Sequence, residues 1–349
     1  MSDLGSIDEP DLIPKSVQPS GLRYLFYTWS GRLLALNTLV FIYICIRTGN
    51  IVSPDVSSLL ALGAKDPVRI AQGEFWRFLT PIFVHVGIFH FAFNSYFLYV
   101  VGYQLEQLLG APWFLATYIL SGVAGNVASS VFSVNLSAGA SSSLFGLLGA
   151  GFLLERAISK RVRQLTGRNP QNRAYAMTVI VNIGLGILVP FIDNSAHIGG
   201  LLAGLLMTYA LVNLRPNNLQ PRRPVNGVAA LLLFAGLLCV GIYTSMSPKI
   251  VVTRLSLAGD KAEDVAERIF HYSQALVLSP TDSNLRIKRA RAYLDEGAIN
   301  YAFADLRTVL AEGGHESELR QFANEMDQKG QQIAALELRQ MIASKGLNP

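Results

Sequence analysis

Seven long apolar segments constrain the fold of this chain more than any other feature. A helix needs about 20 apolar residues to cross the roughly 30 Å hydrocarbon core of a bilayer. Only 15% of the 349 residues are charged and 51% are hydrophobic, whereas soluble domains carry about 25% charged residues. The sequence therefore predicts an all-α, multi-pass membrane helix bundle, with spans over residues 33–46 (after an aromatic lead-in), 81–103, 113–132, 139–154, 175–190, 194–212 and 228–243.

The first residues and the two cysteines exclude some alternatives. Residues 1–18 are acidic and polar, without the charged-then-apolar layout of a cleavable signal. We therefore expect the first span to be an uncleaved anchor. Cys45 and Cys239 lie in separate apolar segments and fit no disulfide framework, CxxC motif or zinc spacing. A packing role is expected for both.

The Lys and Arg residues of the connections predict the orientation, because cytoplasmic loops are enriched in them. The connections after spans three and five contain neither residue, and the one after span one is a mild exception. We expect a cell-membrane protein with a cytoplasmic N-terminus and its C-terminal domain on the outer side. The net charge of +5 is thus local and indicates no nucleic-acid partner. The connections after spans four and six carry Arg156, Lys160, Arg161, Arg163, Arg168, Arg173, Arg215, Arg222 and Arg223.

A soluble helical-repeat domain is predicted after Pro248, where the segments become amphipathic and charged. Residues recur there at offsets of 33 or 34 positions, a sign of internal repeats. The stretch 283–314 resembles one tetratricopeptide unit, although Arg286 replaces the aromatic residue of its first helix. The alternative is an ordinary bundle of helical hairpins. The recurring pairs are Tyr272 and Leu306, Ala275 and Val309, Ala290 and Ala323, Gly297 and Gly330, and Ala302 and Ala335.

Four regions follow from these patterns. Residues 1–32 form an N-terminal cytoplasmic segment, and residues 33–213 form a transmembrane core of six helices. Residues 226–246 form a seventh transmembrane helix, and residues 255–349 form a tetratricopeptide-like domain. Such repeats present a helical groove suited to a peptide or protein partner.

Two polar residues open Gly-rich apolar segments in the fourth and sixth spans. Ser141 follows a Gly-Ala pair, and His197 precedes Gly200 and Gly204. A serine activated by a histidine is the arrangement that acyl transfer requires. The alternative is structural, since small residues in membrane helices allow close packing and a membrane serine can bond its own backbone.

A third polar motif lies in span two, where His90 and Asn94 are four residues apart on one helix face. Strongly polar groups within a membrane are costly and tend to be functional, although they can also bridge two helices. HxxxxH lacks the metal-binding HExxH spacing, so we expect no metal. With the predicted orientation, spans two, four and six all enter from the outer side. These polar groups therefore share one level, nearer the outer leaflet.

The residues around Ser141 and His197 suit a pocket in which spans four and six meet. Glycines at Gly146, Gly149, Gly200 and Gly204 would allow close approach. Phe145 lies one turn after Ser141, so it can pack beneath the His197 ring. The side chains of His90 and Asn94, with a backbone N–H near Ser141, could bind an oxyanion. Asp193 is more typical of a loop or cap residue than of a catalytic triad.

The segment 73–210 resembles the rhomboid intramembrane serine proteases. Four motifs carry this resemblance: GEFWRFLTPIFVH, HFAFN, GASSSLFG and AHIGGLLAG. It implies six core helices plus a seventh, Ser141 as nucleophile and His197 as base of a dyad, and no cofactor. It also implies roles for His90 and Asn94 at the oxyanion and supporting roles for Trp76, Arg77, Glu106 and Gly139. Trp76 and Arg77 match a loop embedded in the outer leaflet, and Glu106 matches a glutamate that supports this loop.

One departure from the family pattern is Ser142, where the family usually has glycine. Three consecutive serines also make the register important, and Ser141 fits the family spacing. We therefore expect a peptidase that cleaves transmembrane substrates with an unstable helix and a small residue before the cut. Its gate is placed in span five, where Asn182, Gly184, Gly186 and Pro190 weaken the helix. The alternatives are an inactive rhomboid-like protein that binds unstable membrane clients and an adaptor acting through its helical repeats.

Overall fold

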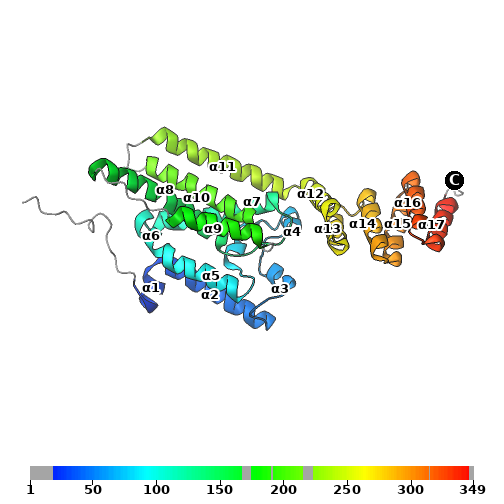
Figure 1. Cartoon of the computed structure of the whole chain (residues 1–349), viewed down its shortest axis with the longest axis horizontal. Coiled ribbons are helices and arrows are strands. Elements are labelled where there is room, and N and C mark those ends of the chain that lie inside the picture. Colours follow the sequence, from blue (N-terminus) through cyan, green and yellow to red (C-terminus); the bar gives the residue numbers. More distant parts are fainter. Residues whose placement is uncertain (1–18, 167–173, 190–191, 215–222, 314, 346–349) are drawn as a thin grey trace, which may run out of the picture.

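The computed structural model describes residues 19–166, 174–189, 192–214, 223–313 and 315–345. The chain is all-α, as predicted, with a membrane bundle followed by a helical domain (Figure 1). Most of the predicted N-terminal segment, the cations at positions 168, 173, 215 and 222, and Pro190 lie outside the described residues. Within the described parts, one isolated bridge pairs Lys65 with Ser137.

The bundle contains a helix at each predicted span. Four of the described helices are long and apolar enough to cross a membrane: α2 (Trp29–Thr48), α7 (Ala111–Phe132), α10 (Asn194–Leu214) and α11 (Pro224–Met246). Between them lie α8 (Ser141–Thr166), whose C-terminal part is charged, and the shorter apolar α9 (Ala174–Leu188). The short α1 (Gly21–Tyr27) precedes α2. These apolar helices indicate a multi-pass membrane protein.

The second span differs from its predicted start near Pro81. The helix begins as α5 (Ile88–Phe97) and continues through a π turn (Leu98–Gly102) into α6 (Tyr103–Leu109). Gly87 ends the preceding segment at φ +124°, and a Cβ there would lie 2.0 Å from the carbonyl oxygen of Val52. An L side chain rarely adopts this conformation, so the chain turns here and the regular helix starts after it.

The connection from α2 to α5 is folded against one end of the bundle. It contains α3 (Val56–Ala61), α4 (Pro67–Ala71) and two 3₁₀ turns (Phe75–Phe78 and Thr80–Phe83). Ile70 and Phe78 of this connection are buried against Val127 of α7 and the partly buried Leu238 of α11. The seventh helix therefore packs on both the core and its first connection.

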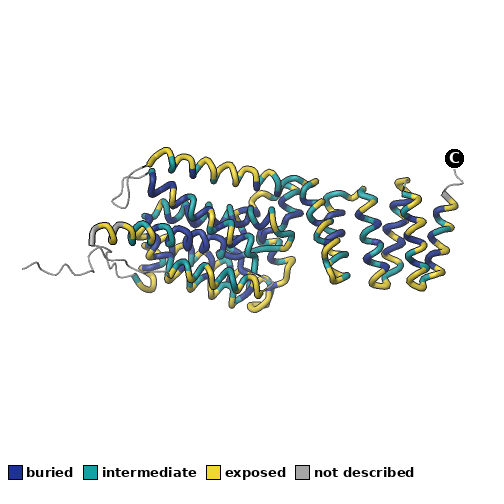
Figure 2. The backbone as a smooth tube through the Cα atoms, turned by 45° about the horizontal axis from the view of Figure 1, so that its top comes forward, coloured by how far each residue is buried: buried dark blue, intermediate teal, exposed yellow. Residues whose placement is uncertain are grey.

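The C-terminal domain continues from that same end of the bundle (Figure 1). It is built from three helical hairpins: α12 (Pro248–Lys261) with α13 (Val265–Leu278), α14 (Ser283–Glu296) with α15 (Ile299–Glu312), and α16 (Glu316–Gln328) with α17 (Gln332–Lys345). The helices alternate in direction, with buried residues along their facing sides (Figure 2). Residue 255, the predicted start of this domain, lies within α12.

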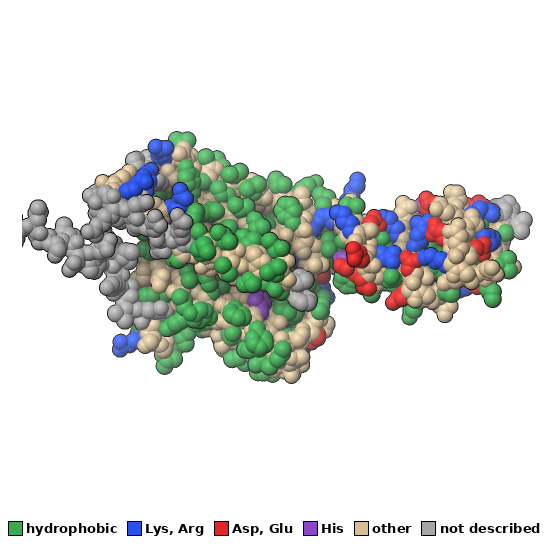
Figure 3. Space-filling model, viewed as in Figure 1, with side chains coloured by type: hydrophobic (Ala, Val, Ile, Leu, Met, Phe, Trp, Pro, Cys, Tyr) green, Lys and Arg blue, Asp and Glu red, His purple; other side chains and the backbone are tan. Residues whose placement is uncertain are grey.

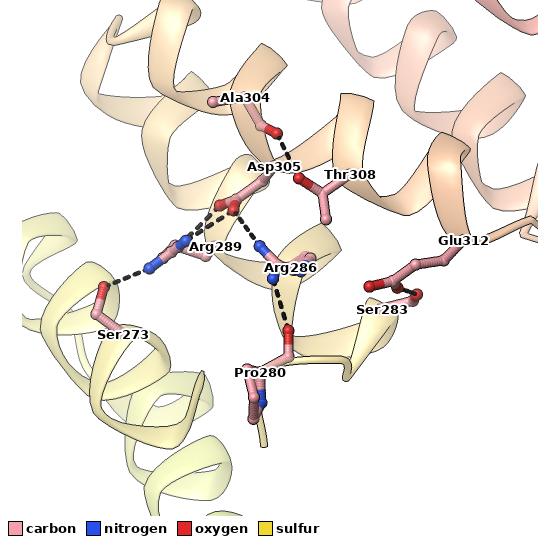
Figure 4. A network of polar contacts seen from close by, with 9 residues as sticks. All are labelled: Ser273, Pro280, Ser283, Arg286, Arg289, Ala304, Asp305, Thr308 and Glu312. Atoms are coloured by element: carbon pink, nitrogen blue, oxygen red, sulfur yellow. Dashed lines mark hydrogen bonds and ion pairs between the residues drawn. The ribbon is translucent and has the colours of Figure 1, made fainter. Parts of the chain in front are cut away.

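The residues that recur in sequence occupy equivalent places in successive hairpins. Gly297 and Gly330 follow α14 and α16 at φ +79° and +77°, where helix ends favour glycine. Ala290, Ala302, Ala323 and Ala335 are fully buried between helices. Arg286, which replaces the expected aromatic residue, joins Arg289 on the buried carboxylate of Asp305 (Figure 4). An ion-paired network thus ties α14 to α15.

Candidate active site

The fold brings Ser141 and His197 into direct contact. The Ser141 hydroxyl oxygen lies 2.9 Å from Nε2 of His197. Ser141 is the first residue of α8, and His197 lies in the first turn of α10. Two residues 56 positions apart thus meet at one end of the bundle, at hydrogen-bonding distance.

Glycines let α8 and α10 approach closely enough for this contact. A Cβ on Gly200 would lie 2.1 Å from the carbonyl oxygen of Ser142. A Cβ on Gly204 would lie 2.0 Å from the carbonyl oxygen of Gly146, one turn further along the pair. Real Cβ atoms do not come this close, so a larger residue at either position would force the helices apart.

The His197 ring is fixed from beneath and from its own helix end. Phe145 stacks on it with ring centroids 4.2 Å apart and an interplanar angle of 13°. Asp193 accepts a bond from the backbone N–H of Ala196 at 3.1 Å and another from the hydroxyl of Ser129 on α7. Asp193 is therefore a helix cap for α10, and it orients the helix rather than the imidazole.

Only the first of the three serines faces the histidine. The Ser142 hydroxyl lies 3.5 Å from the carbonyl oxygen of Gly122, and its Cβ occupies space left by Gly125. Ser143 also faces α7, where a Cβ on Gly122 would lie 2.2 Å from its hydroxyl oxygen. The helix directs these side chains away from α10, so the contact with His197 belongs to Ser141.

His90 and Asn94 lie on α5 beside the segment that leads to Ser141. The His90 ring packs over Gly139, where a Cβ would lie 2.4 Å from the ring carbon Cε1. Gly139 has φ +133°, so both its backbone and the ring require a glycine here. Asn94 donates one amide hydrogen to the carbonyl oxygen of His90 at 2.8 Å. Its second amide N–H remains available as a donor.

Comparisons with known proteins match this region. The Rhomboid domain model covers residues 72–214. Rhomboid-like protease 1 of Toxoplasma gondii is 30% identical over 210 residues, which are 58% of this chain and 71% of the relative. The chain belongs to the rhomboid family. Rhomboid protease GluP of Bacillus subtilis (strain 168) is 38% identical over 217 residues, and RHOMBOID-like protein 6, mitochondrial, of Arabidopsis thaliana is 33% identical over 172 residues.

The last two matches are partial on both sides. They cover 62% and 48% of this chain, but only 41% and 54% of the relatives. The rhomboid domain model ends at residue 214, the last residue of α10, before the seventh helix. The family assignment thus concerns the six-helix core, and it leaves the role of the helical repeats open.

The residues around Trp76, which belong to one of the motifs shared with rhomboids, form a compact turn at the edge of the bundle. Trp76 is half exposed, whereas Arg77 is buried and donates to the carbonyl oxygen of Ala64 at 2.7 Å. Arg77 also binds Glu74, with 2.6 Å between the guanidinium and the carboxylate. The aromatic side chain thus faces outward while the cation holds the turn together.

The structure corrects the expected role of Glu106. Its two carboxylate oxygens accept bonds from the backbone N–H groups of Trp29 and Ser30 at 2.9 and 3.0 Å. The Ser30 hydroxyl donates to it at 2.9 Å. Glu106 therefore caps the first turn of α2, where a helix leaves unpaired N–H groups. It does not support the Trp76–Arg77 turn, which is held by Glu74 instead.

Two glycines of α9, the helix predicted to contain the gate, differ in the space around them. A Cβ on Gly186 would lie 2.1 Å from the side chain of Asn194, whereas nothing lies within 4 Å of one on Gly184. Asn182 donates to the carbonyl oxygen of Thr178 at 2.8 Å, within its own helix. None of the side chains of α9 is fully buried, so its neighbours cover this helix only in part.

Sequence reasoning missed two buried polar groups near the site. His85 was quoted as part of a motif without a role, yet it is fully buried and its ring lies 5.4 Å from that of His90. Lys65 belongs to the connection after span one, the mild exception to the charge pattern, and it too is fully buried. For His85, the HxxxxH repetition was a usable signal; for Lys65, no sequence pattern marks its backbone partners. The described residues include no group of three His, Cys, Asp or Glu side chains placed to hold a metal.

Proposed function

We propose that this rhomboid is an intramembrane serine endopeptidase that cleaves transmembrane-helix substrates near the outer leaflet. The observation that carries the proposal is the 2.9 Å contact between the Ser141 hydroxyl and the His197 imidazole. The chain is a rhomboid with relatives named as proteases, which supports this chemistry. Rigid packing of both residues on glycine-rich helices supports it further.

In this mechanism Ser141 is the nucleophile and His197 is the general base. His197 takes the hydroxyl proton as the serine oxygen attacks the scissile carbonyl carbon, and it then passes the proton to the leaving amine. The negative oxygen of the tetrahedral intermediate binds donors from His90, Asn94 and the backbone near Ser141. Water then attacks the acyl-enzyme with His197 again as base, which releases the second product and restores the serine.

The proposal also includes the orientation, the substrates and the partner of the repeat domain. With the site near the outer leaflet, the C-terminal domain lies on the outer side and the N-terminus lies in the cytoplasm. Substrates enter the bundle beside α9 and carry a weak helix with a small residue before the cut. The three hairpins form tetratricopeptide-like repeats whose groove takes a protein or peptide partner. Recurrence of buried alanines and of positive-φ glycines at 33-residue offsets supports this repeat assignment.

The second candidate function is client binding without cleavage, and Ser142 is the observation that favours it. A serine stands where the family usually has glycine. The packing argues against inactivation, because the glycine at position 125 leaves room for the Ser142 Cβ. The backbone of α8 is therefore not displaced by the substitution.

Cleavage of a generic transmembrane substrate by the purified protein tests the proposal. Ser141→Ala should lower the rate by at least about 1,000-fold, since single triad members contribute at least this much in serine proteases. Ser142→Ala and Ser143→Ala are matched controls that should keep activity within about tenfold. A serine-directed phosphonate probe should label wild type and both controls but not Ser141→Ala. Labelling lost only in Ser142→Ala would assign the nucleophile to that residue, and an unlabelled wild type that retains a bound client would establish the binding function.

Orientation is tested separately with a cysteine at an exposed site of α17. Glu337→Cys should react with a membrane-impermeant maleimide in intact cells, because its side chain is half exposed on the repeat domain. The unsubstituted protein, which contains Cys45 and Cys239, gives the background. Reaction only after the cells are opened would place the domain in the cytoplasm.

A further inference from the structure

The segment that joins α7 to Ser141 is fixed to the connection between α2 and α5. The backbone N–H of Lys65 donates to the carbonyl oxygen of Ser137 at 2.8 Å, and the N–H of Ser137 donates back at 3.2 Å. Gly139 donates to the carbonyl oxygen of Pro81 at 2.8 Å. These hydrogen bonds to the connection thus fix the position of the residues immediately before the candidate nucleophile.

The side chain of Lys65 strengthens this attachment. Its fully buried ammonium donates to the carbonyl oxygens of Asn135 and Ser133, at 2.5 and 3.4 Å. These carbonyls lie just beyond the last residue of α7, where the helix dipole is negative and carbonyls lack helical partners. A buried amine is costly unless it is well bonded. The two carbonyl oxygens supply such bonds here.

A second cation reaches the same helix end from the C-terminal domain. Arg254 of α12 donates to the carbonyl oxygen of Ser130, in the last turn of α7. Nearby, Val251 and Leu255 of α12 are buried in one cluster with Val68 of α4, and Val134 packs against it. Val134 belongs to the segment between α7 and Ser141. The first helix of the repeat domain therefore touches the segment that carries the candidate nucleophile.

We infer that Lys65 and Arg254 are positioning residues for Ser141, and that α12 is thereby part of the active-site framework. Together they bind three carbonyl oxygens, those of Ser130 in the last turn of α7 and of Ser133 and Asn135 in the following segment. This inference rests on the proposed peptidase function. It gives α12 a role in cleavage itself, independent of any partner that the later repeats bind.

The charges around Lys65 define how it responds to pH. Burial lowers the pKa of its ammonium from 10.5 to about 8; Asp193 and Asp66 raise this pKa, and Arg254 lowers it further. Asp193 is already engaged by Ala196 and Ser129. The ammonium therefore loses its proton as the pH rises through about 8, and its grip on the two carbonyls weakens. Wild-type kcat should fall over that range, and Lys65→Met should lack this step.

Kinetics of the full-length protein in lipid test the positioning role. Arg254→Met and Lys65→Met should lower kcat about 10- to 100-fold with KM within about twofold, because a shift of about 1 Å can cost about 100-fold in rate. Arg254→Lys keeps a cation and should retain kcat within about threefold. Arg307→Met, at a pair that is 64% and 50% exposed on the repeat domain, is the matched control and should behave as wild type.

Hydrogen exchange over residues 133–140 separates this inference from the peptidase proposal. Both methionine variants should speed exchange in this segment at least about tenfold, and Arg254→Lys should not. Exchange and kcat unchanged in well-folded Arg254→Met and Lys65→Met would overturn the positioning role. If wild type neither cleaves nor reacts with the serine probe, the peptidase proposal fails, while the exchange data still decide whether the two cations hold the segment. If a methionine variant does not fold, wild type measured across pH 7 to 9 decides the question for Lys65, whose pKa is about 8. Exchange over residues 133–140 should then rise by more than the intrinsic pH dependence of amide exchange, and no such excess would overturn the positioning role.

Discussion

The membrane bundle and the repeat domain are both helical, yet different contacts hold their helices together. Within the bundle, α8 and α10 meet through backbone atoms at Gly200 and Gly204. Polar side chains there often bond the turn before them, as Asn213 does to the carbonyl oxygen of Tyr209 at 2.8 Å. Large apolar side chains such as Leu202 and Leu237 are exposed on its outside, while others such as Phe114 are buried within it. The face of the bundle seen in Figure 3 is correspondingly rich in apolar side chains.

The repeat domain differs from the bundle in its charged surface and in its ion pairs. Large side chains such as Phe322, Leu306 and Met326 fill its interior. Its surface mixes acidic and basic side chains (Figure 3), and ion pairs cross from helix to helix. Arg289 makes two bonds of 2.7 and 2.8 Å to the carboxylate of Asp305, which is only 3% exposed.

The surrounding solvent explains this difference. Lipid offers no hydrophobic gain for bringing helices together, so association in the bundle depends on close backbone packing and internal hydrogen bonds. In water the hydrophobic effect favours burial of apolar side chains in the repeat domain, and charged side chains on its surface remain hydrated at little cost in free energy. The junction at α12 combines both regimes, because Leu255 fills an apolar cluster while Arg254 binds a carbonyl group of the core.

Among the changes that test this comparison, Gly200→Val should produce the largest effect, because a valine side chain there disrupts backbone packing directly. A Cβ here would lie 2.1 Å from the Ser142 carbonyl oxygen, so α8 and α10 must separate. Overpacking costs about 1–3 kcal/mol or more, and cleavage should fall at least about 100-fold because the Ser–His contact opens. The matched control is Gly236→Val on α11, where nothing lies within 4 Å. Thermal unfolding in detergent and substrate cleavage measure both effects; equal behaviour of the two variants would remove the close-packing argument.

Asp305→Asn should be the most damaging polar change in the repeat domain. It leaves the guanidinium groups of Arg286 and Arg289 without their buried counter-charge. Removing one partner of a buried ion pair costs about 3–5 kcal/mol. Hydrogen exchange of α13–α15 should accelerate strongly, while exchange in α7 and α10 stays unchanged. Equal acceleration in the bundle would show that the two regions do not unfold separately.

The sequence predicted the bundle better than the contacts that orient it. Hydropathy located the helices because lipid tolerates few charged residues along a span. The close approach of Ser141 and His197 was predicted from their glycine-rich neighbours, and Ser141 was chosen among the three serines because it fits the spacing of the family motif. The start of α5 was misplaced because the turn at Gly87 depends on Val52, far away in sequence.

Partners that are backbone groups leave no trace in a side-chain pattern. Glu106 was assigned to the wrong end of the core because its ligands are two N–H groups of α2. Lys65 and Arg254 were missed for the same reason, since both bind carbonyl oxygens near the end of α7. In the repeat domain, by contrast, the recurring alanines and glycines predicted the hairpins directly, because each repeat reuses the same buried positions.

Acid should weaken the repeat domain through Asp295, a smaller effect than the loss of Asp305. Burial alone would raise the pKa of this carboxyl, but the hydrogen bonds and charges of Lys329 and Arg268 outweigh it and lower the pKa below 3.8. A carboxyl with a lowered pKa stabilises the fold above its unfolded value of about 3.9 and loses that contribution as the pH falls further. Asp295→Asn should therefore cost about 1 kcal/mol at neutral pH and flatten the stability profile below about pH 4. A profile unchanged from wild type would show that Asp295 contributes nothing to acid stability.

The smallest effect is expected for an ion pair whose two side chains are both exposed to water. Arg307 and Glu337 lie 3.4 Å apart, with side chains 64% and 50% exposed. Solvent-exposed pairs contribute about 0.2–1 kcal/mol and are screened by salt. A double-mutant cycle with Arg307→Met and Glu337→Gln should give a coupling below about 0.5 kcal/mol that vanishes in 1 M salt. A coupling free energy as large as that between Arg289 and Asp305 would mean that burial does not separate strong from weak ion pairs in this domain. The contrast with the lipid-facing bundle would then rest on apolar packing alone.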